Sequence, residues 1–328
     1  MLKVGILNIT SYSGMELIRI LDSHPEVEVT QVTGRSQAGK MLDDVFPFYN
    51  GKLKINENLK EDTDLIFSAL PHKASAEIIG QYVNNDIPVI DFSADFRLPL
   101  DIYEKIYDVK HPYPSLIDKF IYGLPEKNKE KIKISKFVAN PGCFPTCATI
   151  PLLPLNNITN IIIDAKTGIS GAGRSQNINH SFSEISDNIS AYSIEGHRHE
   201  PEIENNINNN VYLTTQLSSI TRGIFSSIYF QSQDEIDLEK YKNYFNDTPF
   251  VNVCSDPPKV KEVRGTNNCN IFIQKLPKKS SINNYRIVSV IDNLVKGAAG
   301  QAVQNMNIMF NFEETLGLNN MALYPYSL

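Results

Sequence analysis

Cys143 is the residue whose setting in this chain best suits a nucleophile. It follows a Pro-Gly pair in the segment ANPGCFPT, and an apolar run extends from Cys147 to Leu155. If that run starts a helix, Cys143 lies at its N-terminus, where free N–H groups and the helix dipole stabilise a thiolate. The other cysteines lie in apolar or strand-like contexts typical of buried filler: Cys147, Cys254 and Cys269.

A thiol nucleophile needs a base, and two histidines two residues apart are the candidates. His197 and His199 flank Arg198 in the segment GHRHEPE. Two zinc ligands on one helix face would be four residues apart, so we expect no metal site here. A histidine beside a carboxylate shuttles protons near neutral pH. We favour His199 over His197 as the acid/base, because Glu200 and Glu202 follow it closely.

Several charged side chains near these residues are candidates for binding an anionic substrate. The glycine-rich segment TGISGAG lies between Lys166 and Arg174 and follows a strand-like run. Such a loop offers backbone N–H groups to a phosphate or a carboxylate. The residues that we expect to bind substrate are Arg198, Lys166, Arg174 and Glu202.

The N-terminal segment has the strand, turn and helix of a dinucleotide site. The three-glycine spacing of such a turn falls on positions 8, 11 and 14. Only Gly14 is glycine, and Asn8 and Ser11 take the other two places. Asparagine tolerates the left-handed backbone conformation better than most residues, so the turn can survive the replacement.

The end of the second predicted strand indicates which dinucleotide is bound. NAD sites place an acid there for the ribose 2′-hydroxyl, whereas NADP sites carry an arginine for the 2′-phosphate. Here Arg35 and Ser36 follow Thr33-Gly34, and the next acid is Asp43. The sequence therefore predicts NADP(H) as the cofactor.

These residues require elements that position them, and the first 140 residues alternate apolar runs with amphipathic stretches. This alternation predicts βαβ units and a Rossmann-like, doubly wound parallel sheet. The expected strands are Lys3–Ile9, Val27–Thr33, Leu65–Ala69 and Pro88–Asp91, and the expected helices are Gly14–Ser23 and Ala74–Asn84.

After Asn140 the strand-like runs follow in series with few helices between them, which predicts an α+β domain with a mostly antiparallel sheet. These runs are Asn160–Ala165, Ile224–Gln231, Cys269–Gln274 and Arg286–Ile291. Two Asn-rich stretches, Asn205–Asn210 and Lys278–Asn284, are expected as surface loops. The amphipathic stretch Gly300–Phe312 is expected to return to the first domain. The predicted division is therefore residues 1–142 plus 298–328 and residues 143–297.

Composition restricts the class of protein. Of 328 residues, 41% are hydrophobic and 21% charged, as in an ordinary globular protein, and the net charge of −6 argues against nucleic acid as a partner. There is no signal-peptide pattern and no apolar run of membrane-spanning length. Few, irregularly spaced cysteines favour a reducing compartment. We therefore expect a cytoplasmic protein that contacts no membrane.

Nine segments in order give the chain a specific resemblance. They are YSGMELIRIL, GRSQAGK, LPHKASAEI, VIDFSADFRL, YGLPE, ANPGCFPT, DAKTGISGAGR, GHRHEPEIE and VKGAAGQAVQNMNIMF. Together they resemble the N-acetyl-γ-glutamyl-phosphate reductase family, which is similar to aspartate-semialdehyde and glyceraldehyde-3-phosphate dehydrogenases. The resemblance implies a nucleophilic Cys143, a base from His197 or His199, and assembly as a homo-oligomer. It also implies cofactor contacts from Ser11, Ser13, Gly14, Arg35 and Ser36.

The activity that the resemblance implies is NADPH-dependent reduction of N-acetyl-γ-glutamyl phosphate through a Cys143 thioester. Three other functions compete with it: a related dehydrogenase acting on aspartyl phosphate, a Cys-His hydrolase without cofactor, and a non-catalytic dinucleotide sensor. Retention of both Cys143 and the two histidines argues against the sensor.

Overall fold

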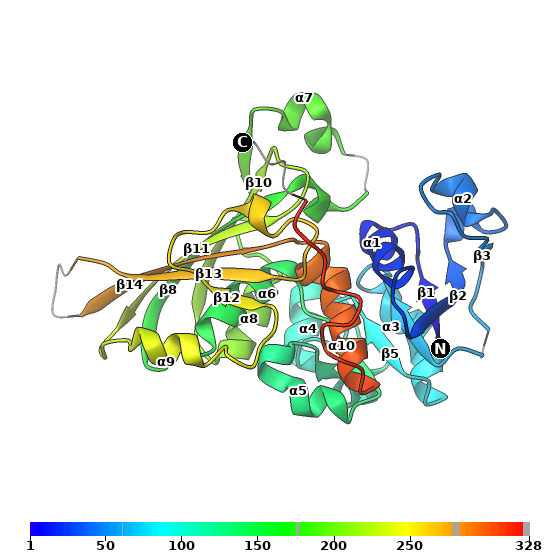
Figure 1. The fold of residues 1–328 in the computed structure, drawn as a ribbon, viewed down its shortest axis with the longest axis horizontal. Coiled ribbons are helices and arrows are strands. Elements are labelled where there is room, and N and C mark those ends of the chain that lie inside the picture. The colour runs from blue at the N-terminus through cyan, green and yellow to red at the C-terminus, as the bar shows by residue number, and fades with distance from the viewer. Residues whose placement is uncertain (61, 175–176, 278–281, 324–328) are drawn as a thin grey trace. The chain divides into compact units, whose positions relative to one another are not determined.

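The structure is a computed structural model that describes residues 1–60, 62–174, 177–277 and 282–323 (Figure 1). The chain divides into two compact units. Unit 1 comprises Met1–Pro141 and Ala298–Leu318, and unit 2 comprises Gly142–Gly297 and the described residues that follow Leu318. The expected division placed residue 142 and the segment after 318 in the first domain. Within unit 2 the Leu323 N–H donates to the Arg264 carbonyl at 2.8 Å, while residues 324–328 lie outside the described part.

Unit 1 is built on a seven-stranded sheet in which every pairing is parallel. The strands in sheet order are β3 (Ile55–Asn56), β2 (Val27–Thr33), β1 (Leu2–Leu7), β4 (Leu65–Ser68), β5 (Val89–Asp91), β7 (Phe137–Ala139) and β6 (Ile121–Tyr122). The order reverses direction between β1 and β4, and open parallel sheets bind nucleotides outside the carboxyl ends of the strands at such a point. The predicted Rossmann-like fold is confirmed.

Several helices of unit 1 contact the strands of this sheet. The helices of the unit are α1 (Tyr12–Leu21), α2 (Leu42–Val45), α3 (Ala74–Asn84), α4 (Leu100–Tyr107), α5 (Pro125–Lys133) and α10 (Gly300–Met309), with 3₁₀ turns at Arg35–Gln37 and Pro114–Lys119. The returning helix α10 packs against α5 and α1 (Figure 1). Its polar side chains are used inside the unit: the Asn305 amide donates to the Gly123 carbonyl at 2.9 Å.

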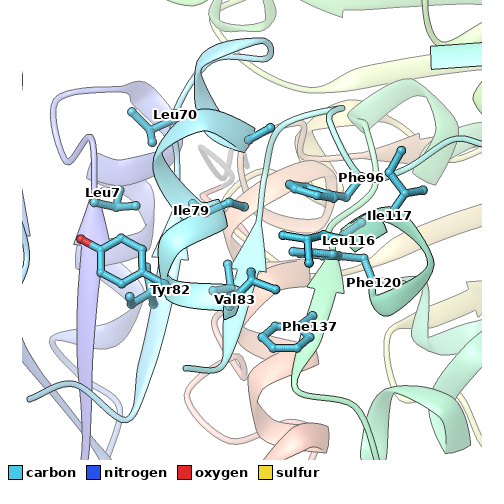
Figure 2. Close-up of a cluster of buried hydrophobic side chains, with 14 of the residues drawn as sticks. Leu7, Leu70, Ile79, Tyr82, Val83, Phe96, Leu116, Ile117, Phe120 and Phe137 are labelled. Atoms are coloured by element: carbon cyan, nitrogen blue, oxygen red, sulfur yellow. The ribbon is translucent and has the colours of Figure 1, made fainter. Parts of the chain in front are cut away.

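Apolar side chains of α3 pack against the sheet and the segment around Pro114–Lys119 (Figure 2). Phe96 and Phe120 stack with ring centroids 4.0 Å apart, and Phe137 packs against Phe120. Ile79 and Val83, one helical turn apart on α3, are buried in the same cluster. Burial of this cluster fixes α3 on the sheet and so fixes the loop between β4 and α3.

Unit 2 holds a second seven-stranded sheet, of mixed direction. The strands in sheet order are β12 (Val251–Val253), β13 (Cys269–Lys275), β14 (Asn283–Ile291), β11 (Ile224–Ser232), β8 (Ile158–Gly168), β10 (Val211–Ser218) and β9 (Ile189–Tyr192). The β8–β10 and β12–β13 pairs are parallel, and the other four pairs are antiparallel. The predicted mostly antiparallel sheet is therefore confirmed.

Two helices cover one face of this sheet. The helices of unit 2 are α6 (Cys143–Leu152), α7 (Phe182–Ile185), α8 (Glu200–Ile207) and α9 (Leu238–Asn243), with 3₁₀ turns at Ile169–Ala172, Ile178–His180 and Val260–Glu262 and a π-helical turn at Val295–Ala299. Helix α6 packs on β11, β14 and α8, and α8 packs on β10.

The predicted surface loop at Asn205–Asn210 is partly wrong. Helix α8 extends through Ile207, and Asn206 is buried with its amide donating to the Glu202 carbonyl at 2.8 Å. Tertiary packing of α8 overrides the weak helix propensity of asparagine. In the second Asn-rich stretch Asn283 and Asn284 belong to β14, whereas residues 278–281 lie outside the described residues.

Candidate active site

Cys143 is the first residue of α6, with Gly142 as the N-cap. The Gly142 N–H donates to Glu202 Oε1 at 2.8 Å, and the Thr146 hydroxyl donates to the Gly142 carbonyl at 2.9 Å. These bonds fix the turn from both sides. Cys143 is half-buried, whereas Cys147, one helical turn later, is completely buried, and burial raises the pKa of its thiol. The structure thus places Cys143 at the helix N-terminus expected for a reactive thiol.

Gly297 packs directly against the nucleophile candidate. A Cβ atom at position 297 would lie 2.8 Å from the Cys143 Cβ, closer than two carbon atoms can approach without displacement. The segment around Gly297 therefore passes Cys143 only because it lacks a side chain there. Sequence reasoning missed this residue, although the glycine in VKGAAGQ was the available signal.

His197 and His199 lie immediately before α8, and the structure brings both to Cys143. Their ring centroids are 4.8 Å apart, and Phe144, the residue after Cys143, contacts both rings edge-on. Both histidines are more than nine-tenths buried. Helix α8 begins at Glu200-Pro201, and proline suits a first turn because it has no N–H to satisfy.

The two histidines have different environments. Burial, together with the smaller effect of the nearby Arg198 charge, lowers the pKa of His197 to about 4. The His199 N–H also donates to His197 Nδ1 at 3.1 Å. A neutral ring that accepts at Nδ1 carries its proton on Nε2. His197 is therefore held as one neutral tautomer across the physiological pH range.

Cys143 and both histidines line a cavity of about 790 Å³ within unit 2. This volume suits a small organic substrate. The other walls come from β8, β10 and the segment 177–193. The sequence analysis did not include this segment in the predicted site. The cavity residues from that segment are Asn177, Asn179, His180, Glu184, Ile185, Asn188, Ser190, Ala191, Tyr192 and Ser193. Polar residues in a region without clear periodicity gave no sequence signal for a shared site.

Tyr192, from the segment 177–193, lines the same cavity as Cys143. Burial raises the pKa of its phenol, and the charge of Cys143 raises it further. The phenol therefore remains protonated at neutral pH, which makes it a hydrogen-bond donor in the cavity that Cys143 lines.

Of the four residues predicted to bind substrate, the structure places only Arg198 among the cavity residues. Arg198 is exposed and lines the cavity. Lys166 does not: Thr167 faces the cavity, so its neighbour on β8 faces the opposite side of the sheet, where Lys166 pairs with Asp164 at 2.8 Å. Arg174 is exposed and is not among the cavity residues, although Gly171 and Ala172 are.

Glu202 is buried and is not among the cavity residues, and it accepts the Gly142 N–H. In the predicted anion-binding loop, several backbone N–H groups already donate hydrogen bonds within the protein. Those of Gly168, Ile169 and Ser170 donate to carbonyls of residues 220–223. No cluster of metal-ligating side chains occurs in the described residues, nor do those residues include a helix long and apolar enough to cross a membrane.

The predicted cofactor residues lie together in unit 1. Helix α1 begins at Tyr12 with Ser11 as the N-cap, whose hydroxyl accepts the Gly14 N–H at 2.9 Å. A Cβ atom on Gly14 would lie 2.7 Å from the Asn8 carbonyl oxygen, so only glycine allows this approach of helix to strand. Ser13 lies in the first turn of α1. The geometry fits a dinucleotide pyrophosphate at the helix N-terminus.

Arg35 and Ser36 begin the short 3₁₀ turn directly after β2, and both are exposed. Their place beside the carboxyl end of β1 suits contact with the ribose of a bound dinucleotide. Burial raises the pKa of Asp91, on β5, to about 6. Ser75 and Ser93 both donate to its carboxyl group, so this acid is a structural link between loops at the same edge of the sheet.

Comparison with protein families assigns both parts of the chain. Residues 3–135 match the model of the semialdehyde dehydrogenase NAD binding domain, and residues 143–293 match that of the semialdehyde dehydrogenase dimerisation domain. The first match confirms a nucleotide cofactor. Solved structures agree at the level of fold. An aspartate semialdehyde dehydrogenase from Vibrio cholerae has a TM-score of 0.74 at 17% identity, covering 95% of this chain and 98% of that one. The Candida albicans enzyme, solved with NADP, has a TM-score of 0.73 at 18% identity, covering 94% and 98%.

Curated relatives align over nearly the full length. An N-acetyl-gamma-glutamyl-phosphate reductase from Dehalococcoides mccartyi is 45% identical, covering 98% of this chain and 99% of the relative. Relatives of the same name from Halothermothrix orenii and Neisseria meningitidis are 41% and 40% identical, covering 99% of this chain and at least 99% of each relative. Identity of this extent, together with both domain matches, shows that the chain belongs to the N-acetyl-γ-glutamyl-phosphate reductase family, a family of oxidoreductases.

Proposed function

We propose that the chain reduces N-acetyl-γ-glutamyl phosphate to N-acetyl-glutamate 5-semialdehyde through a thioester on Cys143, with release of phosphate. The observation that carries this mechanism is one cavity lined by Cys143, His197 and His199, with Cys143 at the first residue of a helix. A thioester divides one difficult displacement into two easier steps. The family name supports the identity of the acyl phosphate.

In the first step the Cys143 sulfur attacks the acyl carbon, and the carbon–oxygen bond to phosphate breaks with its electrons leaving on phosphate. When bound, the nicotinamide supplies the hydride that reduces the thioester carbonyl. A histidine then donates a proton to the forming oxygen and recovers it as the carbon–sulfur bond breaks and the aldehyde leaves.

His199 is the better candidate for this histidine. The lowered pKa of His197 and its bond from the His199 N–H make His197 a fixed neutral ring, poorly suited to cycling a proton at neutral pH. His197 would instead orient the substrate through its Nε2–H. The protonated Tyr192 phenol is a second donor in the same cavity.

Arg198 is the candidate for binding the phosphate or carboxylate of the substrate, because it is the arginine among the cavity residues. Lys166 and Arg174 remain candidates only if substrate binding rearranges the loop between them.

We propose NADP(H) as the cofactor, held by Ser11, Ser13 and Gly14 at the pyrophosphate and by Arg35 and Ser36 at the 2′-phosphate. The position of Arg35 after β2, where an NAD site would carry an acid, supports this choice. Arg35→Asp should reverse the preference between NADPH and NADH, as measured by the ratio of their dissociation constants. An unchanged ratio would contradict the assignment.

A second copy of this chain is the partner that we propose. On the sheet face of unit 2 opposite α6 and α8, Ile162 pairs in register with Tyr212 on β10 and Tyr229 on β11. These side chains are 49%, 74% and 39% exposed, and a row of exposed apolar residues on a sheet favours an interface. The matched dimerisation domain supports a homo-oligomer.

A reduced thiol nucleophile supports a cytoplasmic location.

The covalent step can be tested without cofactor. Incubation with the acyl phosphate alone should release one phosphate per subunit and add the acyl mass to the chain at Cys143, as measured by mass spectrometry. Cys143→Ser should abolish both signals, whereas the half-buried Cys254→Ser control should retain them. Full activity in the Cys143 variant would overturn the mechanism.

The substrate can be tested by running the reaction in reverse. N-acetyl-glutamate semialdehyde, phosphate and NADP⁺ should produce NADPH, and aspartate semialdehyde should be a much poorer substrate. Equal rates with the two aldehydes would contradict the acyl-group assignment. Absence of any NADPH binding would favour a Cys-His hydrolase.

A further inference from the structure

Asn8 occupies the point in unit 1 where three strand ends meet. It follows β1 with a φ of +61°, in the left-handed region that favours glycine. The neighbouring strands in the sheet are β2, which ends at Thr33, and β4, which is followed by Ala69. The three-glycine spacing places a glycine at this position, whereas Asn8 carries a side chain that can form hydrogen bonds.

The Asn8 side chain joins two loops. Its Nδ2 donates to the Ala69 carbonyl at 2.9 Å, which links the β1–α1 turn to the β4–α3 loop. Its Oδ1 accepts from the Thr10 hydroxyl at 3.2 Å. The Asn8 N–H donates to Thr33 Oγ1 at 3.2 Å. Of these three bonds a glycine would keep only the last, because the other two use side-chain atoms.

Ser11, at the second missing glycine, extends the same arrangement. Its hydroxyl donates to the Asn8 carbonyl at 3.1 Å and accepts the Gly14 N–H at 2.9 Å. It therefore closes the turn and caps α1 with one oxygen atom. The N–H groups of Tyr12 and Ser13, also in the first turn, come too early in the helix for an intrahelical bond and so can face an anion.

We propose that Asn8 is a positioning residue that holds the cofactor turn and the β4–α3 loop in their binding arrangement before the dinucleotide arrives. In this chain, side-chain hydrogen bonds of Asn8 and Ser11 fix the turn, whereas glycines at these two positions would leave its backbone freer to move. The inference rests on unit 1 binding the dinucleotide. A site whose competent arrangement is populated in advance binds more tightly, because binding need not select it from a mobile ensemble.

The expected size follows from the bond between the two loops that is lost, which is the one from Asn8 Nδ2 to the Ala69 carbonyl. Removing one hydrogen bond of ordinary strength changes a conformational equilibrium about five-fold, so Asn8→Gly should raise the NADPH dissociation constant by up to about five-fold. Glycine adopts the left-handed conformation without strain, so the variant should fold.

The matched control is Asn311→Gly. Asn311 is another left-handed asparagine of unit 1, with a φ of +55°, and unlike the half-buried Asn8 it is exposed. It adjoins Phe312, which contacts His24 beyond the C-terminal end of α1, at the opposite end from the cofactor turn. The same chemical change there should leave NADPH affinity unchanged.

The experiment measures NADPH dissociation constants by calorimetry, and amide hydrogen exchange of residues 8–14 and 69–73 without cofactor. Asn8→Gly should weaken binding and speed exchange in both segments, and Asn311→Gly should do neither. Unchanged or tighter binding by Asn8→Gly would overturn the inference. Faster exchange with unchanged affinity would also overturn it, since the link would then not serve the cofactor. If the parent chain itself bound no dinucleotide, the proposed function would fail instead.

Discussion

His197 should make the protein lose stability in mild acid. In the folded protein burial holds its pKa at about 4, compared with 6.5 for an ordinary histidine. As the pH falls below 6.5, the unfolded chain binds a proton at this position while the folded protein stays neutral until about pH 4. Stability contributed by the neutral ring is therefore complete above pH 6.5 and decreases through the window from 6.5 to 4.

The magnitude follows from the size of the shift. Each pKa unit corresponds to about 1.4 kcal/mol, so the loss should reach about 2 kcal/mol at pH 5 and about 3 kcal/mol near pH 4. His197 is only 7% exposed, so solvent screening reduces these values little.

The perturbation is His197→Asn, which cannot titrate but keeps an acceptor where Nδ1 receives the His199 N–H. The free energy of unfolding in urea should be measured by circular dichroism at pH 7 and pH 5 for both proteins, since the chain has no tryptophan. The parent should lose about 2 kcal/mol more than the variant between these pH values. Groups such as Asp91, whose pKa is also shifted, are present in both proteins and cancel.

NMR of ¹³C-labelled histidine gives an independent measurement. The resonance that disappears in the variant should titrate near pH 4 in the parent. Titration near 6.5, or parallel stability changes in the two proteins, would refute the claim that His197 is held neutral, and with it the preference for His199 as the acid/base.

Three further substitutions test the structural basis of the site. Glu202→Ala should cost about 1–3 kcal/mol of unfolding free energy and lower kcat, because it leaves the Gly142 N–H without its acceptor. Glu202→Gln should retain most of the stability and of kcat. Equal losses in the two variants would assign the effect to the charge instead. Gly297→Ala should cost about 1–3 kcal/mol and slow alkylation of Cys143, since the new methyl group displaces it; an unchanged alkylation rate would contradict the packing. Lys73→Gly should raise the unfolding free energy by up to about 1 kcal/mol, because Lys73 has a φ of +73°, which strains any residue other than glycine. Thermal unfolding that showed no gain in stability would rule out strain at this position.

Local pattern was sufficient for much of the fold. The ranges predicted for β2 and α3 agree with the structure at both ends, Val27–Thr33 and Ala74–Asn84. The prediction for α1 started two residues late, because the Ser11 cap was not recognised in a turn expected to hold glycine. Polar and apolar periodicity reports directly on which backbone conformation buries the apolar face, so such elements can be predicted from sequence.

The sequence by itself determined which side chains are candidates for the proposed reaction: a cysteine after a Pro-Gly turn and two histidines before a helix have a chemistry that depends on residue type and local backbone. Only the tertiary structure decided which other residues join them. Lys166 and Thr167 are neighbours in sequence, yet one faces the cavity and the other does not, because strand pairing selects the face. Glu202 and Gly297 reach the Cys143 turn across 60 and 154 residues of chain. Contacts of this kind depend on how helices and strands pack, which no local pattern records.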